Sequence, residues 1–172
     1  MSTAFVFPGQ GSQAVGMGRA LAESFATARD VFEEIDEALK QRLSRLMFEG
    51  PESELTLTEN AQPALMAVSL AAVRVVERDG GARLPGKVVF VAGHSLGEYS
   101  ALAAAGALSL SDAARLLKRR GKAMQEAVPV GKGAMAALLG ADLEAATGIA
   151  QAAATRPARS ARPPTTMRPG RW

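Results

Sequence analysis

The sequence predicts an α/β protein in which a parallel sheet carries helices on both faces. Residues 4–7 and 87–92 are short apolar runs rich in Val and Phe, as buried strands are. The segments between and after these runs repeat apolar residues at intervals of three and four, which is typical of amphipathic helices. Strands that are separated by helices usually pair in parallel, so the expected order is β, α, α, β, α.

The first expected strand, residues 4–7, ends at a glycine-rich loop, residues 8–13. Apolar residues then recur at helical spacing over residues 21–39, which predicts one amphipathic helix with a break near Thr27. Gly50-Pro51 predicts a turn after it. Because ligands bind at the carboxyl ends of parallel strands, the loop after the first strand is expected to border a site.

The second half of the predicted core contains three more helices. Residues 64–76 are apolar on nearly every side, so we expect a central buried helix that has Pro63 in its first position. A helix over 98–105 follows the second strand, since this run has no helix breaker. Ser111 is expected to cap a further helix that runs to about Glu126.

From Val128 the pattern changes, and residues 133–140 and 141–154 predict a strand and a helix that open a second unit. The last residues are rich in Arg and Pro and have no periodicity. The expected domains are a core at 1–127, the start of a small subdomain at 128–154 and a disordered tail at 155–172.

Composition excludes several classes of protein. Of 172 residues, 48% are hydrophobic and 22% charged, as in ordinary globular domains. The chain contains no Cys, which excludes disulfides, thiol catalysis and thiolate metal sites. We expect no membrane span, because no apolar run approaches about 18 residues. The start lacks a basic leader, so a cytoplasmic location is expected.

The net charge of +3 arises in the tail. Residues 155–172 contain five arginines and no acidic residue, so removing these five from the 20 basic residues leaves 15 against 17 acidic ones. The folded part is therefore slightly acidic, and we expect no nucleic-acid partner.

The central motif is Gly93-His94-Ser95-Leu96-Gly97, a G-x-S-x-G sequence between the second strand and a helix. Such a strand–turn–helix presents the serine hydroxyl at the end of the strand, which makes Ser95 a candidate nucleophile. The Leu96 N–H, at the positive end of the helix, is placed to bind an oxyanion. The alternative interpretation is a serine in an ordinary glycine-flanked turn.

With these residues the chain resembles the malonyl-CoA:acyl carrier protein transacylases of fatty acid synthesis and the related acyltransferase domains of polyketide synthases. Several motifs in family order carry the resemblance, which covers residues 4 to about 154. They are Phe7-Pro8-Gly9-Gln10-Gly11-Ser12-Gln13, Gln62-Pro63-Ala64, Gly93-His94-Ser95-Leu96-Gly97-Glu98-Tyr99, Arg120-Gly121 and Gly133-Ala134-Met135-Ala136.

The resemblance implies a hydrolase-like acyltransferase core and the start of a truncated ferredoxin-like subdomain. It implies that Ser95 attacks malonyl-CoA and that acyl carrier protein then accepts the malonyl group, without a metal or cofactor. In the family the oxyanion hole maps onto the N–H groups of Gln10 and Leu96. Arg120 matches the arginine that pairs with the malonyl carboxylate, and Gln62 matches a glutamine lining the acyl site. Without the resemblance, the pattern favours Arg120 as one of several solvent-facing basic residues on its helix. For Gln62 a polar residue before a helix-starting proline is an equally good interpretation.

One part of the family pattern is missing. The family pairs its serine with a histidine from a later segment, whereas the only histidine here is His94. We expect His94 to support the site from behind Ser95 or to serve in packing, because successive side chains at a strand end point to opposite faces. The sequence then supplies no base, and the 172-residue chain is expected to be inactive. A polyketide acyltransferase domain, a serine hydrolase and a non-catalytic fragment remain alternatives.

The tail suggests why the histidine is missing. With suitable codons for Ala158 to Trp172, another reading frame gives EVCEAANDNAPGQV, which resembles the family's continuation. A frameshift would explain this, and a natural basic tail is the alternative. Loss of later strands should leave a sheet edge and the apolar faces of residues 64–76 and 101–108 uncovered.

Overall fold

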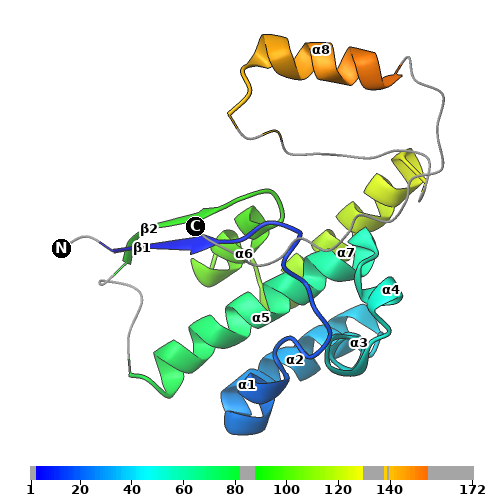
Figure 1. Cartoon of the computed structure of the whole chain (residues 1–172). Helices are drawn as coiled ribbons and strands as arrows, with labels where there is room; N and C mark the ends of the chain where they lie inside the picture. Colours follow the sequence, from blue (N-terminus) through cyan, green and yellow to red (C-terminus); the bar gives the residue numbers. More distant parts are fainter. Residues whose placement is uncertain (1–2, 82–87, 130–137, 139, 155–172) are drawn as a thin grey trace. The chain divides into compact units, whose positions relative to one another are not determined.

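The computed structural model describes residues 3–81, 88–129, 138 and 140–154. The chain divides into two compact units, Met1–Gly133 and Ala134–Trp172, and the first contains every element but α8 (Figure 1). The elements are β1 (Thr3–Phe7), α1 (Arg19–Ser24), α2 (Ala26–Leu39), α3 (Leu43–Glu49), α4 (Glu52–Leu55), α5 (Thr58–Arg78), β2 (Val88–Gly93), α6 (Gly97–Ala104), α7 (Leu110–Ala127) and α8 (Leu143–Ala154).

The two strands pair in parallel, as predicted. The register runs from Ala4 opposite Phe90 to Phe7 opposite Gly93, with one irregularity between Thr3 and Ala4. Both strands therefore end side by side, which brings the loop after β1 next to the turn after β2. This pairing confirms the α/β class with a parallel sheet.

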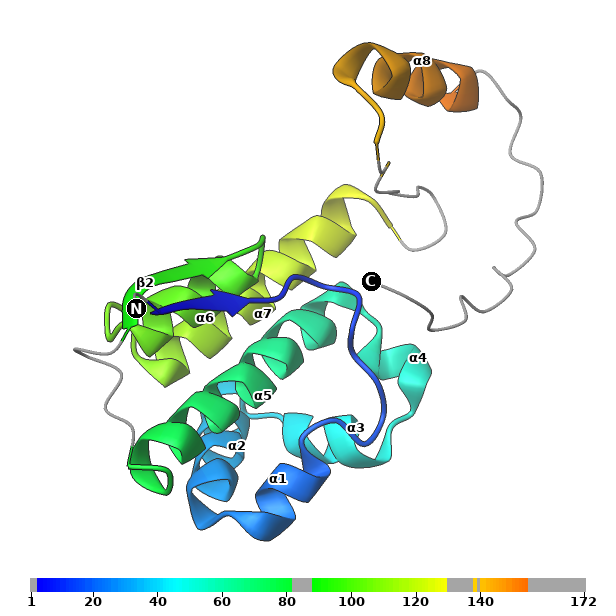
Figure 2. The same ribbon diagram turned by 60° about the vertical axis from the view of Figure 1, so that its left-hand side comes forward.

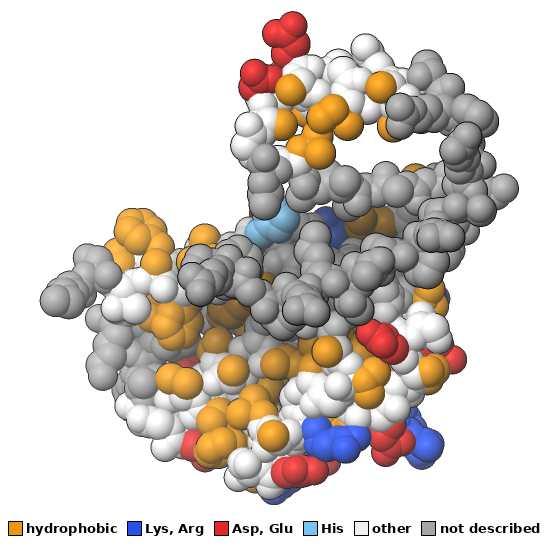
Figure 3. Space-filling model, viewed as in Figure 1, with side chains coloured by type: hydrophobic (Ala, Val, Ile, Leu, Met, Phe, Trp, Pro, Cys, Tyr) orange, Lys and Arg blue, Asp and Glu red, His pale blue; other side chains and the backbone are white. Residues whose placement is uncertain are grey.

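The helices cover the two faces of this sheet unequally. On one face Phe7 packs with Val73 of α5 and Ala101 of α6, and Figure 2 shows α6 beside both strands. On the other face Val6 and Phe90 are 75% and 69% exposed. Figure 3 shows uncovered hydrophobic side chains over the sheet. Within the described residues, helices thus cover one of the two faces that were predicted to be covered.

The main core lies among α2, α5 and α7. Ile35 of α2, Met66 of α5 and Leu117 of α7 are almost fully buried in one cluster. The predicted central burial of residues 64–76 is confirmed. The expectation that this segment would lack cover is wrong for most of its residues, because α2 and α7 pack on it and Phe7 of the sheet packs against Val73. Val76 is exposed. Of residues 101–108, Ala101 is buried and Leu108 packs against the core, whereas Leu102 is 40% exposed, so this part of the expectation is confirmed only in part.

Helix α5 begins at Thr58, upstream of Pro63, so the prediction that Pro63 occupies the first helical position is wrong. A proline lacks the N–H that closes a helical turn, but the turn before it has a partner in another helix. The Glu59 N–H donates to Gln125 Oε1 of α7 over 2.7 Å. Contact with α7 therefore lets α5 begin before Pro63, earlier than the local sequence indicates.

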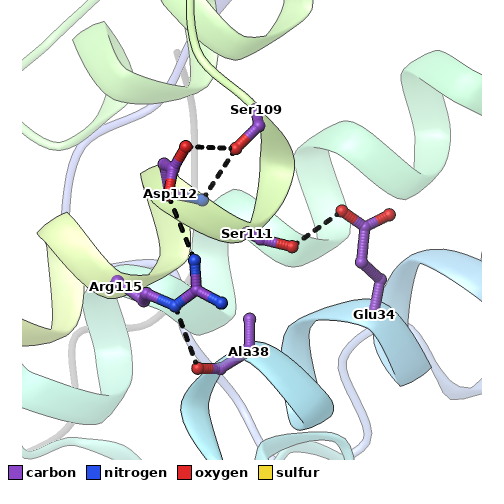
Figure 4. Close-up of polar contacts among 6 residues, drawn as sticks. All are labelled: Glu34, Ala38, Ser109, Ser111, Asp112 and Arg115. Carbon is purple, nitrogen blue, oxygen red and sulfur yellow. Dashed lines mark hydrogen bonds and ion pairs between the residues drawn. The ribbon is translucent and has the colours of Figure 1, made fainter.

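Helix α7 is capped by Ser109 rather than by Ser111, which corrects the prediction. The Ser109 hydroxyl oxygen accepts from the Asp112 N–H at 3.0 Å, and its own O–H donates to Asp112 Oδ2 at 2.7 Å (Figure 4). The helix starts earlier because Leu110 is buried in the core. The hydrogen bond from Ser109, together with the Arg115 guanidinium, lowers the pKa of Asp112 below its ordinary value.

Ser111 has a different partner, on α2. Its hydroxyl donates to Glu34 Oε1 over 3.0 Å, and Arg115 Nε donates to the Ala38 carbonyl over 3.3 Å (Figure 4). These bonds join α2 to the start of α7 beside the apolar core. The first half of α7 is therefore held by both apolar and polar contacts.

The structure also bears on the predicted helix break near Thr27 and on the elements predicted after Val128. The break near Thr27 is found at Phe25, whose extended backbone separates α1 from α2, whereas α3 and α4 were not predicted. Helix α8 agrees with the helix expected at 141–154 and buries no residue. The strand expected at 133–140 lies mostly outside the described residues, and the tail at 155–172 lies entirely outside them. No helix in the described ranges is long and apolar enough to span a membrane.

Candidate active site

Ser95 occupies a sharp turn between β2 and α6. Its φ of 56° lies in the left-handed region, which is costly for a residue with a side chain. The turn is closed by a bond from the Gly97 N–H to the His94 carbonyl, at 2.9 Å. The Ser95 side chain is exposed at the carboxyl end of the strand, where the motif predicts it.

The two glycines of the motif are required by close backbone approach. A Cβ added to Gly93 would lie 1.9 Å from the Gly97 carbonyl carbon, inside the turn itself. A Cβ added to Gly97 would lie 2.4 Å from the Phe7 carbonyl oxygen of the neighbouring strand. Glycine at both positions therefore lets the turn form and lets α6 approach the end of β1.

The loop after β1 lies against this turn. The His94 N–H donates to the Phe7 carbonyl at 3.2 Å, and a Cβ on Gly9 would lie 2.4 Å from His94 Nδ1. Neither the Gln10 N–H nor the Leu96 N–H has a hydrogen-bond partner in the described part of the chain. Both free donors thus come from the two segments that meet at the ends of the parallel strands.

The side chain of Arg120 bonds to two other predicted site residues. Its Nη2 donates to Ser95 Oγ at 3.0 Å, and its Nη1 donates to Gln62 Oε1 at 2.7 Å. Gln62 is fully buried in α5. The neighbouring Arg119 is exposed. The structure therefore brings together Arg120 of α7, Gln62 of α5 and Ser95 of the turn after β2.

Two site neighbours were missed from the sequence. Met124 Sδ accepts from Gln62 Nε2 at 3.3 Å, and Thr58 Oγ1 accepts from Gln10 Nε2 at 3.5 Å. Met124 could have been found, because it follows Arg120 by four residues and so lies on the same face of the helix. Thr58 carried no comparable signal, since its helix was predicted to begin later.

No base contacts Ser95 in the described residues. The partner of Ser95 Oγ is the Arg120 guanidinium, which has no acceptor and does not give up its proton in proteins. His94 is exposed with its ring beside Gly9, and no hydrogen bond between its side chain and Ser95 occurs in this part of the chain. The packing role expected for His94 stays a prediction, because its side chain is exposed beside Gly9.

This chain belongs to the acyl transferase domain family, whose model matches residues 4–160. It is similar to the malonyl CoA-acyl carrier protein transacylase of Bacillus subtilis (strain 168), with 56% identity over 142 residues that make up 83% of this chain and 43% of the relative. The resemblance that the motifs carry is thus confirmed.

Solved structures are similar as well. The crystal structure of acyl-carrier-protein-S-malonyltransferase from Bartonella henselae has a TM-score of 0.82 and 60% identity, covering 90% of this chain and 49% of that one. A type II polyketide acyl-carrier protein in complex with its malonyl-transacylase gives a TM-score of 0.69 and 47% identity, covering 75% and 40%. The chain therefore spans less than half the length of these proteins.

Proposed function

We propose that this chain provides the nucleophile and the acyl-selecting cation of a malonyl-CoA:acyl carrier protein transacylase. The observation that carries the proposal is the bridge that Arg120 makes between Ser95 Oγ and the buried Gln62. An acyl group on Ser95 would lie within reach of this guanidinium. A guanidinium binds a carboxylate through two parallel hydrogen bonds, so an acyl group with a free carboxylate is favoured over a neutral one.

In the first half-reaction Ser95 Oγ forms a bond to the thioester carbonyl carbon of malonyl-CoA. The carbon–sulfur bond breaks, and the proton lost from the serine hydroxyl leaves with coenzyme A as its thiol. The negative charge that develops on the carbonyl oxygen needs N–H donors already in place. The free N–H groups of Gln10 and Leu96 are the proposed donors.

In the second half-reaction the thiol of acyl carrier protein attacks the malonyl-serine ester. Its sulfur bonds to the carbonyl carbon, the bond to Ser95 Oγ breaks, and the thiol proton returns to the serine. Acyl carrier protein is the proposed acceptor because relatives are named for it and one similar structure is a complex with such a protein. Malonyl-CoA is the substrate, and the proposal assigns no cofactor or metal.

Both half-reactions need a group that takes and returns a proton. The resemblance places this base, a histidine, in a segment of the family beyond the matched half. General-base assistance is typically worth 10²–10⁴-fold. We therefore propose that the 172-residue chain is inactive by itself and that residues 1–140 become active when the remaining part of the Bacillus subtilis relative is joined to them. This fusion is called the completed protein below.

Radiolabelled malonyl-CoA tests the proposal. Brief incubation should leave label on the completed protein, and Ser95→Ala should abolish it, while the 172-residue chain should remain unlabelled. Added acyl carrier protein should then remove the label and carry it. Equal labelling of the Ser95→Ala variant would contradict the assignment of the nucleophile, and release of the label to water alone would indicate a hydrolase.

A further inference from the structure

The way in which α7 is held changes along its length. Its first half is buried against α2 and α5 through the apolar residues Leu110, Ala113, Ala114 and Leu117. After Leu117, Gly121 is the only buried residue in α7, every residue of which is described. Arg120 therefore lies in a part of the helix that the apolar core does not hold, so other contacts must determine where its guanidinium lies.

Three residues of this second half contact Glu59, in the first turn of α5. Lys118 Nζ lies 2.9 Å from Glu59 Oε2, and Gln125 Oε1 accepts from the Glu59 N–H at 2.7 Å. Between them, a Cβ added to Gly121 would lie 2.4 Å from Glu59 Cα, so the two helices touch there at backbone level. Spacings of three and four place Lys118, Gly121 and Gln125 on one face of α7. These three contacts are called the Glu59 clamp below.

The clamp is tied into its surroundings through Lys118. The lysine also donates to Asn60 Oδ1 at 2.7 Å, and Asn60 is buried. Asn60 Nδ2 in turn donates to the Glu54 carbonyl at 2.9 Å. The side chains of Lys118 and Glu59 are 19% and 23% exposed, so water and salt screen this ion pair less than an open surface pair.

The clamp lies beside the candidate site on the same two helices. Arg120 and Met124, on the adjoining face of α7, contact Gln62, which follows Glu59 by one helical turn. A rotation or a slide of α7 on α5 would move both faces together. A change in the contacts on Glu59 would therefore also move Arg120 relative to Gln62 and Ser95.

We propose that the Glu59 clamp positions the second half of α7 so that Arg120 bridges Gln62 and Ser95. Lys118 and Gln125 are positioning residues, since they act on the site through Arg120. The clamp thereby sets the preference for acyl groups with a free carboxylate, and this consequence rests on the proposed function. The positioning of Arg120 itself does not rest on it.

Nitrogen-15 NMR of the guanidinium groups tests positioning in the 172-residue chain without any substrate. Hydrogen bonds from both Nη atoms should slow rotation of the Arg120 group, whose signals are assigned by their loss in Arg120→Lys. Lys118→Met should speed this rotation roughly five- to tenfold, as expected for a loss of about 1 kcal/mol. Lys118→Arg should restore it. Lys122→Met is the matched control, because Lys122 is exposed and lies outside the clamp.

A second variant separates loosening of Arg120 from unfolding of the chain. Gln125→Ala removes one hydrogen bond and leaves the apolar core intact, so it should loosen Arg120 while thermal unfolding stays cooperative. Fast rotation of Arg120 in the unaltered chain would overturn the proposal. Unchanged slow rotation in both Lys118→Met and Gln125→Ala would overturn it as well.

The completed protein tests the consequence for selectivity. Lys118→Met should lower the ratio of malonyl to acetyl labelling of Ser95 roughly ten- to a hundredfold, as displacement of a catalytic group by about 1 Å can. Lys122→Met should leave the ratio unchanged. A completed protein that shows no preference for malonyl would contradict the proposed function, while the NMR result would still decide the positioning. An unchanged ratio despite a loosened Arg120 would overturn the link between clamp and selectivity.

Discussion

Helix α5 and strand β2 are both apolar segments, yet they differ sharply in burial. In α5 Leu65 and Met66 are 4% and 0% exposed, because α2 and α7 pack on either side of the helix. In β2 Val89 and Phe90 are 59% and 69% exposed. Helices α2 and α7 cover α5 from two sides, whereas successive side chains of a strand point to opposite faces, so those on a face that no other layer covers stay exposed. Hydrophobicity alone therefore did not decide which segment is buried.

The largest expected effect is a loss of stability when a buried residue of the helical core is truncated, compared with a residue on the open sheet face. Leu117→Ala should lower the free energy of unfolding by about 2–5 kcal/mol, because it leaves a cavity where α7 meets the core. Val6→Ala, on the open face of the sheet, should change it by no more than about 0.5 kcal/mol. Urea unfolding of both variants measures this. Equal losses would mean that the sheet face is covered in solution.

The second prediction concerns the site where the two regions meet. In the completed protein, Arg120→Ala should slow malonyl transfer by about 1.5–3 kcal/mol in activation free energy, since it removes charge-assisted hydrogen bonds to a carboxylate. Acetyl transfer should change much less. Arg119→Ala is the control, because Arg119 is adjacent in sequence but exposed. Equal losses for both acyl groups would show that Arg120 supports the fold instead.

The third prediction concerns the open face of the sheet, which should promote self-association of the chain. Phe90→Thr should weaken self-association of the 172-residue chain about tenfold, since sheltering a phenylalanine contributes about 1.5–3 kcal/mol. Light scattering across a concentration series measures the association. Arg42→Ala is the control, because Arg42 is exposed but lies outside the sheet, so this change should not affect association. If the Phe90→Thr chain associates as strongly as the parent, the open sheet face does not cause the self-association.

The smallest effect is a pH dependence at the start of α7. The hydrogen bond from Ser109, aided by Arg115, lowers the pKa of Asp112 from its ordinary value of 3.8 in the folded chain. Above pH 3.8 the stabilisation from Asp112 is fully present, and it is lost as pH falls below 3.8, because the unfolded chain takes up the proton first. The Tm difference between the parent and Asp112→Asn should therefore narrow in acid. In a Ser109→Ala background this narrowing should largely disappear, and its persistence would contradict the assigned cause.

By itself the sequence determined the local geometry around Ser95. The two glycines, the apolar run before them and the breaker-free run after them specify a strand, a sharp turn and a helix through backbone sterics alone. The parallel pairing was predictable for a similar reason, since a crossover of helices leaves little other choice. Arg120 and Gln62 came from the resemblance, because neither has a local signal that separates it from its neighbours.

Tertiary structure decided the features that depend on contacts between distant segments. Whether Arg119 or Arg120 faces Ser95 follows from the rotation of α7, which Gly121 and Glu59 set through backbone contact. The true start of α5 and the use of Ser109 as the cap follow from partners on other helices and from the burial of Leu110. Likewise the open face of β2 depends on what packs against it. Local sequence encodes backbone preference, but rotation, helix ends and burial are settled by neighbours that only the folded chain brings together.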